Sequence, residues 1–338
     1  MWLRFIKARF VTAVIIAHAG LAAAAVDVAS RASHGSGTSD DPWIGWDVNT
    51  AWNAENEYAF RAGTYAYFAS PNFLKSGLAL KGEPGTVLRF LGAGNAVVFD
   101  NPGTSALIYD NWTMNVRMEN FTIEGTAAAT NGIYVRAMRN GLFRNITVRD
   151  VSAAAFRCEA CVTNILDGLH VVPHVVLPSH GIVLAARGGD TSTTLTAMNA
   201  EIAGVREAAV WVQPGSYGNT FMNAVIEGNA GKGFVFDGPL NTVIDTRMHA
   251  NAGADIEINQ SNNEVHGATS TGLVEVRAGQ MSKLRGSFAT VAIAFGCDFT
   301  DVAGANVAVL RDGASSTIKA GSQPVIGVPF AARRGRGP

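Results

Sequence analysis

The 338-residue chain has few charged residues and almost no net charge. Charged side chains make up 16% of the sequence, and 26 Lys and Arg residues against 27 Asp and Glu residues leave a formal net charge of −1. A protein that binds nucleic acid or an anionic membrane through its overall electrostatic field needs an excess of positive charge. The composition therefore argues against both of these partners.

Cysteine is scarce as well, with three residues: Cys158, Cys161 and Cys297. An odd number leaves at least one thiol without a partner inside the chain. Cys158 and Cys161 are close enough in sequence to form a local disulfide, but the sequence leaves this bridge open. Because there is no second Cys-x-x-Cys, a structural zinc site is not expected.

The sequence also lacks the short motifs of several large enzyme classes. It contains no Gly-x-Ser-x-Gly, no His-Glu-x-x-His, no P-loop and no dinucleotide-binding fingerprint. These motifs position a nucleophile, a zinc ion or a phosphate, so their absence argues against the enzymes that use them. No cofactor is predicted. A Ca²⁺ site built by the scattered Asp167, Asp237 and Asp245 has little support from their spacing.

What the sequence does contain is 48% hydrophobic residues, 37 glycines and a recurring apolar pattern between Asn131 and Arg277. In each repeat two apolar residues lie two positions apart, and the first members are separated by 23, 26, 28, 24, 22 and 18 residues. Such alternation is typical of a strand with one buried face, and a period of a few tens of residues predicts a solenoid. The pairs are Ile133/Val135, Phe156/Cys158, Ile182/Leu184, Val210/Val212, Phe234/Phe236, Ile256/Ile258 and Val274/Val276.

Composition divides the chain into four predicted segments. Residues 1–25 contain Arg4, Lys7 and Arg9 and then an apolar run that ends in small residues, which is the order of a secretory signal peptide. Residues 26–41 are predicted to be a flexible leader, residues 42–330 one β-helix domain, and residues 331–338 a disordered tail. We therefore expect a secreted or periplasmic protein that is not in the membrane after signal cleavage.

Aromatic residues gather between Trp43 and Phe68, where they are suited to cap the open end of a solenoid. A Gly-rich segment with a double Asp at 35–41 precedes them, and the segment Arg61-Ala-Gly-Thr-Tyr65 lies among them. With the repeated coils, these residues resemble the pectate-lyase-like superfamily, which has the pectin lyase fold, over residues 35–310. The resemblance implies an all-β, right-handed, single-stranded parallel β-helix with an aromatic-rich N-terminal cap. It also implies a carbohydrate polymer as partner, and a homotrimer as one oligomeric state.

The enzyme motifs of this superfamily are only partly present. His180-Gly181 matches the His-Gly of its galacturonan hydrolases, but no Asp-Asp pair or Arg-x-Lys accompanies it at the proper coils, which argues against polygalacturonase activity. The calcium pectate lyases of the superfamily use Arg and Lys bases, whereas Lys232 is the only lysine between Asn131 and Arg277. The amphipathic helix that usually follows the double Asp is also shorter in this chain.

A second strand can be aligned in five of the coils, and each copy begins with Asn or Asp. These residues tolerate left-handed backbone and cap turns with their side chains, so a stacked Asn/Asp column predicts a repeated bend. The five residues are Asn120, Asn145, Asp167, Asn223 and Asp245.

The same alignment predicts an outward-facing file of charged residues. The core column would be Ile123, Val148, Leu169, Ala200, Ile226 and Met248, and the next residue of each coil would point outward. The outward residues are Glu124, Arg149, His170, Glu201, Glu227 and His249. One interpretation is purely structural: the file is a solvated strip of mixed charge that keeps an exposed strand from aggregating.

The functional interpretation makes Glu201 and Glu227 a catalytic carboxylate pair. In successive coils they would be neighbours about 4.8 Å apart, and one carboxyl would then carry a proton while the other stays ionised. Glycoside hydrolysis uses such a pair. His249 would tune or relay the proton, and Arg149 would hold an anionic group of the substrate.

A second outward column is predicted on the first strand of each coil, with the members Tyr134, Arg157, Val183, Trp211, Val235, Glu257 and Glu275. The rings of Trp211 and Tyr217 are suited to stack on a sugar, or equally to cover a neighbouring loop. The predicted substrate-binding residues are Trp211, Tyr217, His170, Asp245 and Arg247.

Three functions stay open at this point. The favoured one is a secreted enzyme that hydrolyses glycosidic bonds in a polysaccharide or oligosaccharide. The second is a polysaccharide lyase or uronate C5-epimerase that uses His249 or His170 as base and Arg149 to neutralise a uronate. The third is a non-catalytic glycan-binding or adhesive β-helix, because fold alone does not dictate function.

Overall fold

The computed structural model describes residues 25–49, 52–101, 112–279, 281–295, 297, 300–302 and 305–312. The predicted tail at 331–338 and all but the last residue of the predicted signal peptide lie outside these ranges. No helix within them is long and apolar enough to cross a membrane.

Short strands make up almost all of the regular structure. In chain order the elements are β1 (Val26–Asp27), η1 (Val28–Arg31), α1 (Trp46–Asn49), β2 (Glu57–Phe60), β3 (Gly63–Tyr67), β4 (Ala79–Gly82), β5 (Thr86–Phe90), β6 (Val97–Asp100), β7 (Thr113–Met114), β8 (Arg117–Glu124), β9 (Asn131–Arg139), β10 (Leu142–Arg149), β11 (Ala154–Val162), β12 (Ile165–Val171), β13 (His180–Ala185), β14 (Thr196–Met198), β15 (Glu201–Ala203), β16 (Ala208–Val212), β17 (Thr220–Met222), β18 (Val225–Glu227), β19 (Lys232–Phe236), β20 (Thr242–Ile244), β21 (Arg247–His249), β22 (Ile256–Ile258), β23 (Glu264–Val276), β24 (Lys283–Ile293) and β25 (Asn306–Asp312).

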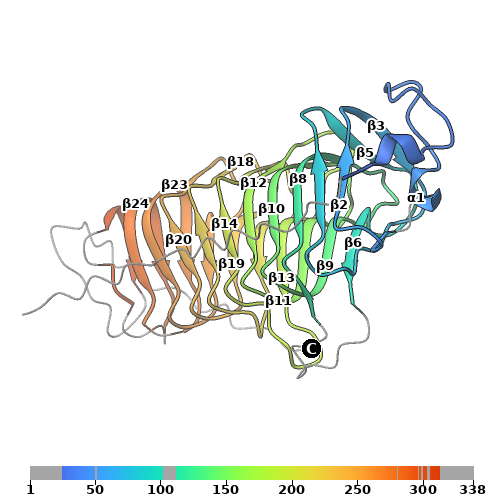
Figure 1. Ribbon diagram of the computed structural model, residues 1–338. Helices are drawn as coiled ribbons and strands as arrows, with labels where there is room; N and C mark the ends of the chain where they lie inside the picture. Colours follow the sequence, from blue (N-terminus) through green and yellow to red (C-terminus); the bar gives the residue numbers. More distant parts are fainter. Residues whose placement is uncertain are drawn as a thin grey trace, which may run out of the picture.

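The named strands pair in parallel and stack into coils with three faces. On the first face β14, β17 and β20 follow one another, and on the second β15, β18 and β21 do so. The third face runs through β9, β11, β13, β16, β19 and β22. Figure 1 shows the coils side by side along one axis, with the blue N-terminal elements at one end and the orange strands at the other. The predicted parallel β-helix is confirmed.

The apolar residues of the repeat fill the interior of the coils. Phe156 pairs with Ile133 and Ile182, and the same register continues through Val210, Phe234 and the later coils. All of these side chains are at most 1% exposed. The stacking therefore turns the alternation seen in the sequence into one continuous core.

The bridge that the sequence left open is present, because Cys158 and Cys161 form a disulfide. Both residues are fully buried, as is Cys297, whose Sγ donates to the carbonyl oxygen of Val276 at 3.4 Å.

The predicted bend is confirmed at four of its five Asn/Asp residues. Asn120, Asn145, Asn223 and Asp245 have positive φ angles of 65°, 52°, 51° and 47°. At Asp167 the prediction is wrong, because the next residue, a glycine, takes the left-handed conformation in that coil.

Side-chain amides extend this bend into a ladder between coils. Asn145 Nδ2 donates to Asn120 Oδ1 at 2.9 Å, and Asn223 Nδ2 donates to Asn199 Oδ1 at 2.7 Å. Asn199, with φ 55°, is a member that the sequence alignment missed.

Aromatic side chains cover the N-terminal end of the core. Trp46 is fully buried and packs edge-on against Trp52, Phe60 and Tyr65, with ring centroids 5.7 to 5.8 Å apart. Its Nε1 donates to a backbone carbonyl at 3.1 Å, so the buried indole has a polar partner.

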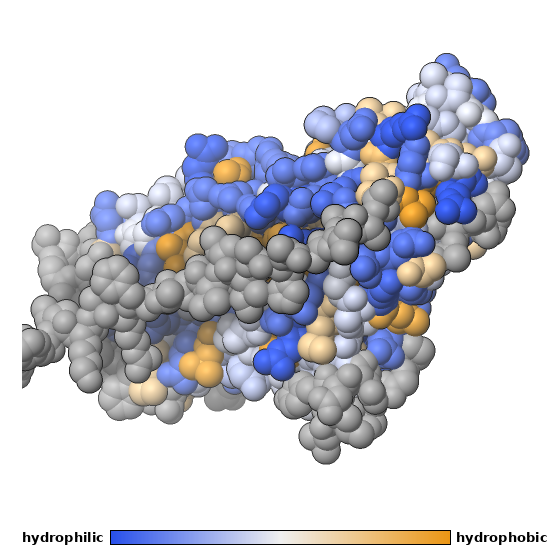
Figure 2. Space-filling view, viewed as in Figure 1, coloured by the Kyte–Doolittle hydropathy of each residue, from blue (hydrophilic) through white to orange (hydrophobic). Residues whose placement is uncertain are grey.

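Strand β1, which lies within the predicted leader, pairs with β2. On the face seen in Figure 2, hydrophilic side chains predominate among the described residues, and hydrophobic ones lie in small separate groups.

Candidate functional site

The residues of the predicted outward file lie on the second face, but at two different register positions, so they form two files and not one. His170 pairs with Glu201, and Glu201 pairs with Val225. Glu227 belongs to the other file, because it pairs with Ala203 and His249. The expectation that Glu201 and Glu227 are direct cross-strand neighbours is wrong. The aligned core residues are Val171, Ile202, Ile226 and Met248, so Leu169 and Ala200 were misassigned to this column.

Glu201 and Glu227 are nevertheless diagonal neighbours on one exposed sheet. One strand spacing of about 4.8 Å and two residues of about 3.3 Å each place their Cα atoms about 8 Å apart. Each carboxylate contacts a histidine of an adjacent coil. His170 Nδ1 lies 3.3 Å from Glu201 Oε2, and His249 Nε2 lies 2.6 Å from Glu227 Oε2.

The two arginines predicted near this pair lie in different surroundings. Arg149 forms an ion pair with Glu124 at 3.5 Å, and it lies on β10, away from β18 and β21. Arg247 lines a shallow hollow together with His249 and Thr269. Arg247 is exposed, and none of the ion pairs among the described residues involves its guanidinium. Of the two, Arg247 is thus the one available to a ligand beside His249.

The predicted second column is confirmed along its whole length on the third face. Its seven members are cross-strand partners in the predicted order, from Tyr134 to Glu275. Trp211 therefore lies on a different face from Glu201 and Glu227. Tyr217 is 40% exposed and sits beyond the end of β16, where it does not line the hollow around Trp211. Asp245 lies at the bend, with its Oδ1 over Gly267.

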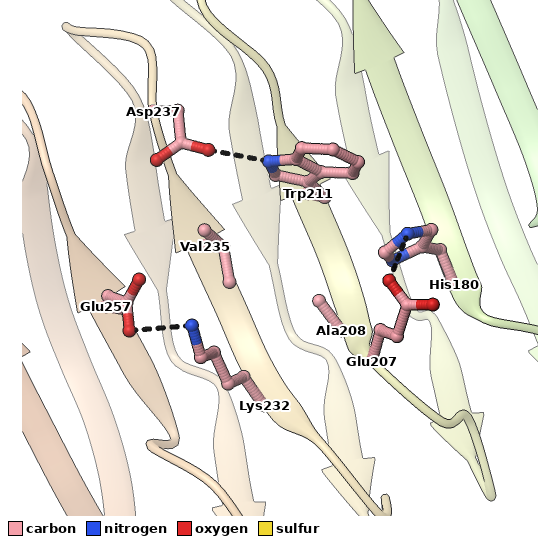
Figure 3. A pocket seen from close by; sticks show the side chains of 8 residues that line it. All are labelled: His180, Glu207, Ala208, Trp211, Lys232, Val235, Asp237 and Glu257. Atoms are coloured by element: carbon pink, nitrogen blue, oxygen red, sulfur yellow. Dashed lines mark hydrogen bonds and ion pairs between the residues drawn. The ribbon is translucent and has the colours of Figure 1, made fainter. Parts of the chain in front are cut away.

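A hollow of about 380 Å³ opens on the third face around Trp211, and we call it the Trp211 hollow. Its walls come from β13, β16, β19 and β22 and from residues that flank β16 and β19 (Figure 3). The lining residues are His180, Glu207, Ala208, Trp211, Lys232, Val235, Asp237 and Glu257.

Hydrogen bonds fix the indole of Trp211. Its Nε1 donates to Asp237 Oδ2 at 2.7 Å, and Asn259 Nδ2 donates to Asp237 Oδ1 at 2.7 Å. Asn259 also donates to Glu257 Oε1 at 3.0 Å. Glu257, whose side chain is only 4% exposed, forms an ion pair with Lys232 at 2.8 Å. Two carboxylates and an amide therefore hold one wall of the hollow in place.

His180 and Glu207 form the opposite wall (Figure 3). His180 Nε2 lies 3.4 Å from Glu207 Oε2, and the imidazole packs against Trp211 with ring centroids 5.0 Å apart. Burial lowers the pKa of His180, although the nearby Glu207 carboxylate opposes this shift. Glu207 is largely exposed, so its carboxylate can reach a ligand in the hollow.

A scan against protein-family models and a search of curated proteins found no match. Among solved structures, the chain is similar to ORF18 of Geobacillus virus E2, with a TM-score of 0.67 and 14% identity over 90% of this chain and 62% of that chain. This chain thus spans less than two thirds of the viral protein. The chain has the pectin lyase fold. Similarity at this identity shows the fold alone.

Two further solved structures resemble this β-helix. The Streptococcus pneumoniae surface adhesin PfbA has a TM-score of 0.49 and 12% identity over 88% of this chain and 89% of that chain. The A-module of the Azotobacter vinelandii mannuronan C-5 epimerase AlgE6 has a TM-score of 0.41 and 17% identity over 88% of this chain and 100% of that chain.

No group of three or more His, Cys, Asp or Glu in the described part of the β-helix is arranged to hold a metal ion. Asp237 and Asp245 lie on different faces, and Asp167 accepts a hydrogen bond from Asn199 at 2.8 Å.

Sequence reasoning did not assign Asp237 and Glu207 of the Trp211 hollow, or Asn259 beside it, to a sugar-binding site. Asp237 and Asn259 follow two residues after members of the predicted column, so continuing the period-2 alternation would have found them. Glu207 precedes its strand in an irregular segment. No periodic signal marks such a position.

Proposed function

We propose that this β-helix binds a carbohydrate chain at the Trp211 hollow. The observation that carries the proposal is the indole of Trp211, which lies in the hollow and is held by Asp237 (Figure 3). A sugar ring has an apolar C–H face and a rim of hydroxyl groups. A flat indole can cover that face, while Asp237 and Glu207 accept hydrogen bonds from hydroxyl groups.

The geometry also favours binding on energetic grounds. Because the indole is already fixed by a hydrogen bond, little side-chain freedom is lost when a ligand stacks on it. The hollow of about 380 Å³ falls within the range of ligand pockets, which is about 300 to 1,000 Å³.

The test is binding to a panel of neutral and acidic polysaccharides, measured by affinity electrophoresis and calorimetry. We expect Trp211→Ala to weaken binding about tenfold, which corresponds to about 1.4 kcal/mol. Tyr217→Ala is the matched control, because it removes another accessible aromatic ring that does not line the hollow. Equal losses in both variants, or none in Trp211→Ala, would refute the proposed binding site.

A second candidate function is cleavage of glycosidic bonds on the second face. The diagonal placement of Glu201 and Glu227 favours it, because about 8 Å between Cα atoms is compatible with the carboxyl separation of inverting glycosidases, about 6.5 to 9.5 Å. One carboxyl would protonate the leaving oxygen while the other activates a water molecule. We expect Glu201→Gln and Glu227→Gln each to abolish the release of reducing ends, and turnover in both variants would rule out this pair.

The same face also suits removal of the C5 proton of a uronate. In that reaction His249, hydrogen-bonded to Glu227, would be the base, and Arg247 would hold the carboxylate. A lyase releases an unsaturated product that absorbs in the ultraviolet, and an epimerase changes the uronate composition without cleavage. If a glycan binds but neither product forms, the remaining function is that of a non-catalytic glycan-binding or adhesive β-helix. The secretion predicted from residues 1–25 stays a prediction.

A further inference from the structure

A buried carboxylate holds two arginines side by side on the third face. Glu159 on β11 is 8% exposed. Its Oε1 accepts from Arg157 Nε at 2.8 Å, and its Oε2 accepts from Arg187 at 2.8 Å. Tyr134 donates its hydroxyl to the same Oε2 at 2.8 Å. Burial by itself raises the pKa of Glu159, but the hydrogen bonds from Arg187, Arg157 and Tyr134 bring it below its usual value. Glu159 therefore stays ionised and keeps both guanidinium groups in place.

Among the described residues, one positive charge of this cluster has no carboxylate of its own. Arg157 and Arg187 share the single carboxylate of Glu159, whereas the neighbouring Arg136 forms its own ion pair with Asp100. The carboxylate of Asp190, in the same hairpin as Arg187, makes no ion pair with either guanidinium in the described part of the chain.

Both guanidinium groups keep N–H donors for a ligand. Within the described ranges Arg157 donates through Nε alone, to Glu159, and Arg187 donates through one terminal nitrogen, to Glu159 and Tyr134. The side chains of Arg157 and Arg187 are 30% and 52% exposed, so the remaining donors are accessible to a ligand.

The arginines lie in line with the Trp211 hollow. Arg157 is the cross-strand partner of Val183, which is in turn the partner of Trp211. Two strand spacings therefore separate Arg157 from Trp211, about 10 Å along the axis. A glycan that stacks on Trp211 and follows the axis of the β-helix would pass over both arginines.

We propose that Arg157 and Arg187 bind an oxyanion carried by the glycan at the Trp211 hollow, either a uronate carboxylate or a sulfate ester. This inference rests on the proposed glycan binding and assigns its substrate class as an acidic polysaccharide. Guanidinium groups donate pairs of parallel N–H bonds to such oxyanions. Because Glu159 fixes both side chains beforehand, little conformational freedom is lost on binding.

The first test compares polymers of different charge. Binding of a polyuronate, a sulfated dextran and an uncharged dextran is measured for the wild-type chain and for the double variant Arg157→Gln/Arg187→Gln. We expect at least a tenfold loss for one of the anionic polymers, which identifies the oxyanion, and less than a twofold change for uncharged dextran. The control variant Arg31→Gln/Arg117→Gln removes the same charge from exposed positions elsewhere and should leave all three affinities unchanged. A loss below twofold in the first variant, or an equal loss in the control, overturns the inference.

The second test separates a fixed site from general attraction by positive charge. Glu159→Gln makes the cluster more positive by one charge but removes the group that orients both arginines. Attraction by net charge alone would strengthen binding to the anionic polymer, whereas an oriented site predicts that binding weakens several-fold. Unfolding temperatures of all variants confirm that they are folded. Binding that is unchanged or tighter in Glu159→Gln overturns the inference.

Failure of the proposed function can be told apart from failure of this inference. If no polymer binds the wild-type chain, sodium sulfate and sodium glucuronate are titrated while the NMR signals of the Nε–H groups of Arg157 and Arg187 are followed. Saturable shifts that disappear in Glu159→Gln support the oxyanion site even without polymer binding. If Trp211→Ala abolishes polymer binding while the arginine variants change nothing, the glycan-binding function stands and the oxyanion site is wrong.

Discussion

Single residues on the third face are held by partners that fix their position before any ligand arrives. Asp237 accepts from Trp211 and Asn259, and Asn259 also reaches Glu257. A polar side chain with partners on both sides loses little freedom when it contacts a ligand. Glu207 differs, because its side chain is exposed and its carboxylate pairs with the imidazole of His180 at the edge of the hollow. The hollow thus has one wall that is held in place and one exposed carboxylate, that of Glu207, which can adjust its position to a ligand.

At the same scale, the largely buried His180 should make stability depend on pH. Burial lowers its pKa in the folded chain below the usual value of about 6.5, and the positive charges of Arg157 and Arg206 act in the same direction, while Glu207 opposes them. The unfolded chain then binds the proton more readily. The contribution of His180 is present above pH 6.5 and is lost as the pH falls through the lowered pKa.

The free energy of urea unfolding at pH 7.5 and at pH 5.5 checks this expectation. We expect the wild-type chain to lose more stability between the two pH values than His180→Gln does. The comparison between chains cancels the contributions of the other titrating groups. Equal losses in both would show that His180 titrates in the folded chain as it does in the unfolded one.

At the scale of strands, the sequence predicted the third face better than the second. The column from Tyr134 to Glu275 could be predicted because period-2 alternation is local to each strand. For the second face, the predicted register was wrong between His170 and Glu201, where insertions of unequal length separate the strands. Ala200 and Ile202 flank Glu201 and are both buried, so the burial pattern fits two registers that differ by two residues. Only the pairing of Ile202 with its partners in adjacent coils distinguishes them.

The amide ladder at the bend between strands should contribute to stability. Asn223 has a φ of 51°, which alanine tolerates poorly, and donates Nδ2 to Asn199. We expect Asn223→Ala to lower the free energy of unfolding by about 2 kcal/mol, and Asn223→Gly by less because glycine keeps the left-handed backbone. Asn262→Ala is the control, since Asn262 has a φ of 59° but is not a member of this ladder. A cost as large in the control would show that the backbone, and not the ladder, accounts for the loss.

The disulfide between Cys158 and Cys161 closes a very short loop. Cross-links stabilise mainly by restricting the unfolded chain, and the restriction grows with the number of residues enclosed. With a sequence separation of 3, we expect reduction to lower the free energy of unfolding by about 2 kcal/mol or less. Denaturant unfolding with and without dithiothreitol measures this difference. A loss well above that value would mean that the bridge also supports native packing around the two buried sulfur atoms.

At the scale of the whole molecule, each coil contacts only its neighbours, so stability should vary along the axis. Strands β16 and β19 lie between paired strands on both sides, whereas β25 pairs with β24 alone among the described strands. At the other end, the cluster around Trp46 covers the core. We therefore expect amide hydrogen exchange, followed by mass spectrometry, to be fastest in β25, slower in β2 and slowest in β16 and β19. Exchange at one common rate throughout would instead show that the whole β-helix opens as a single cooperative unit.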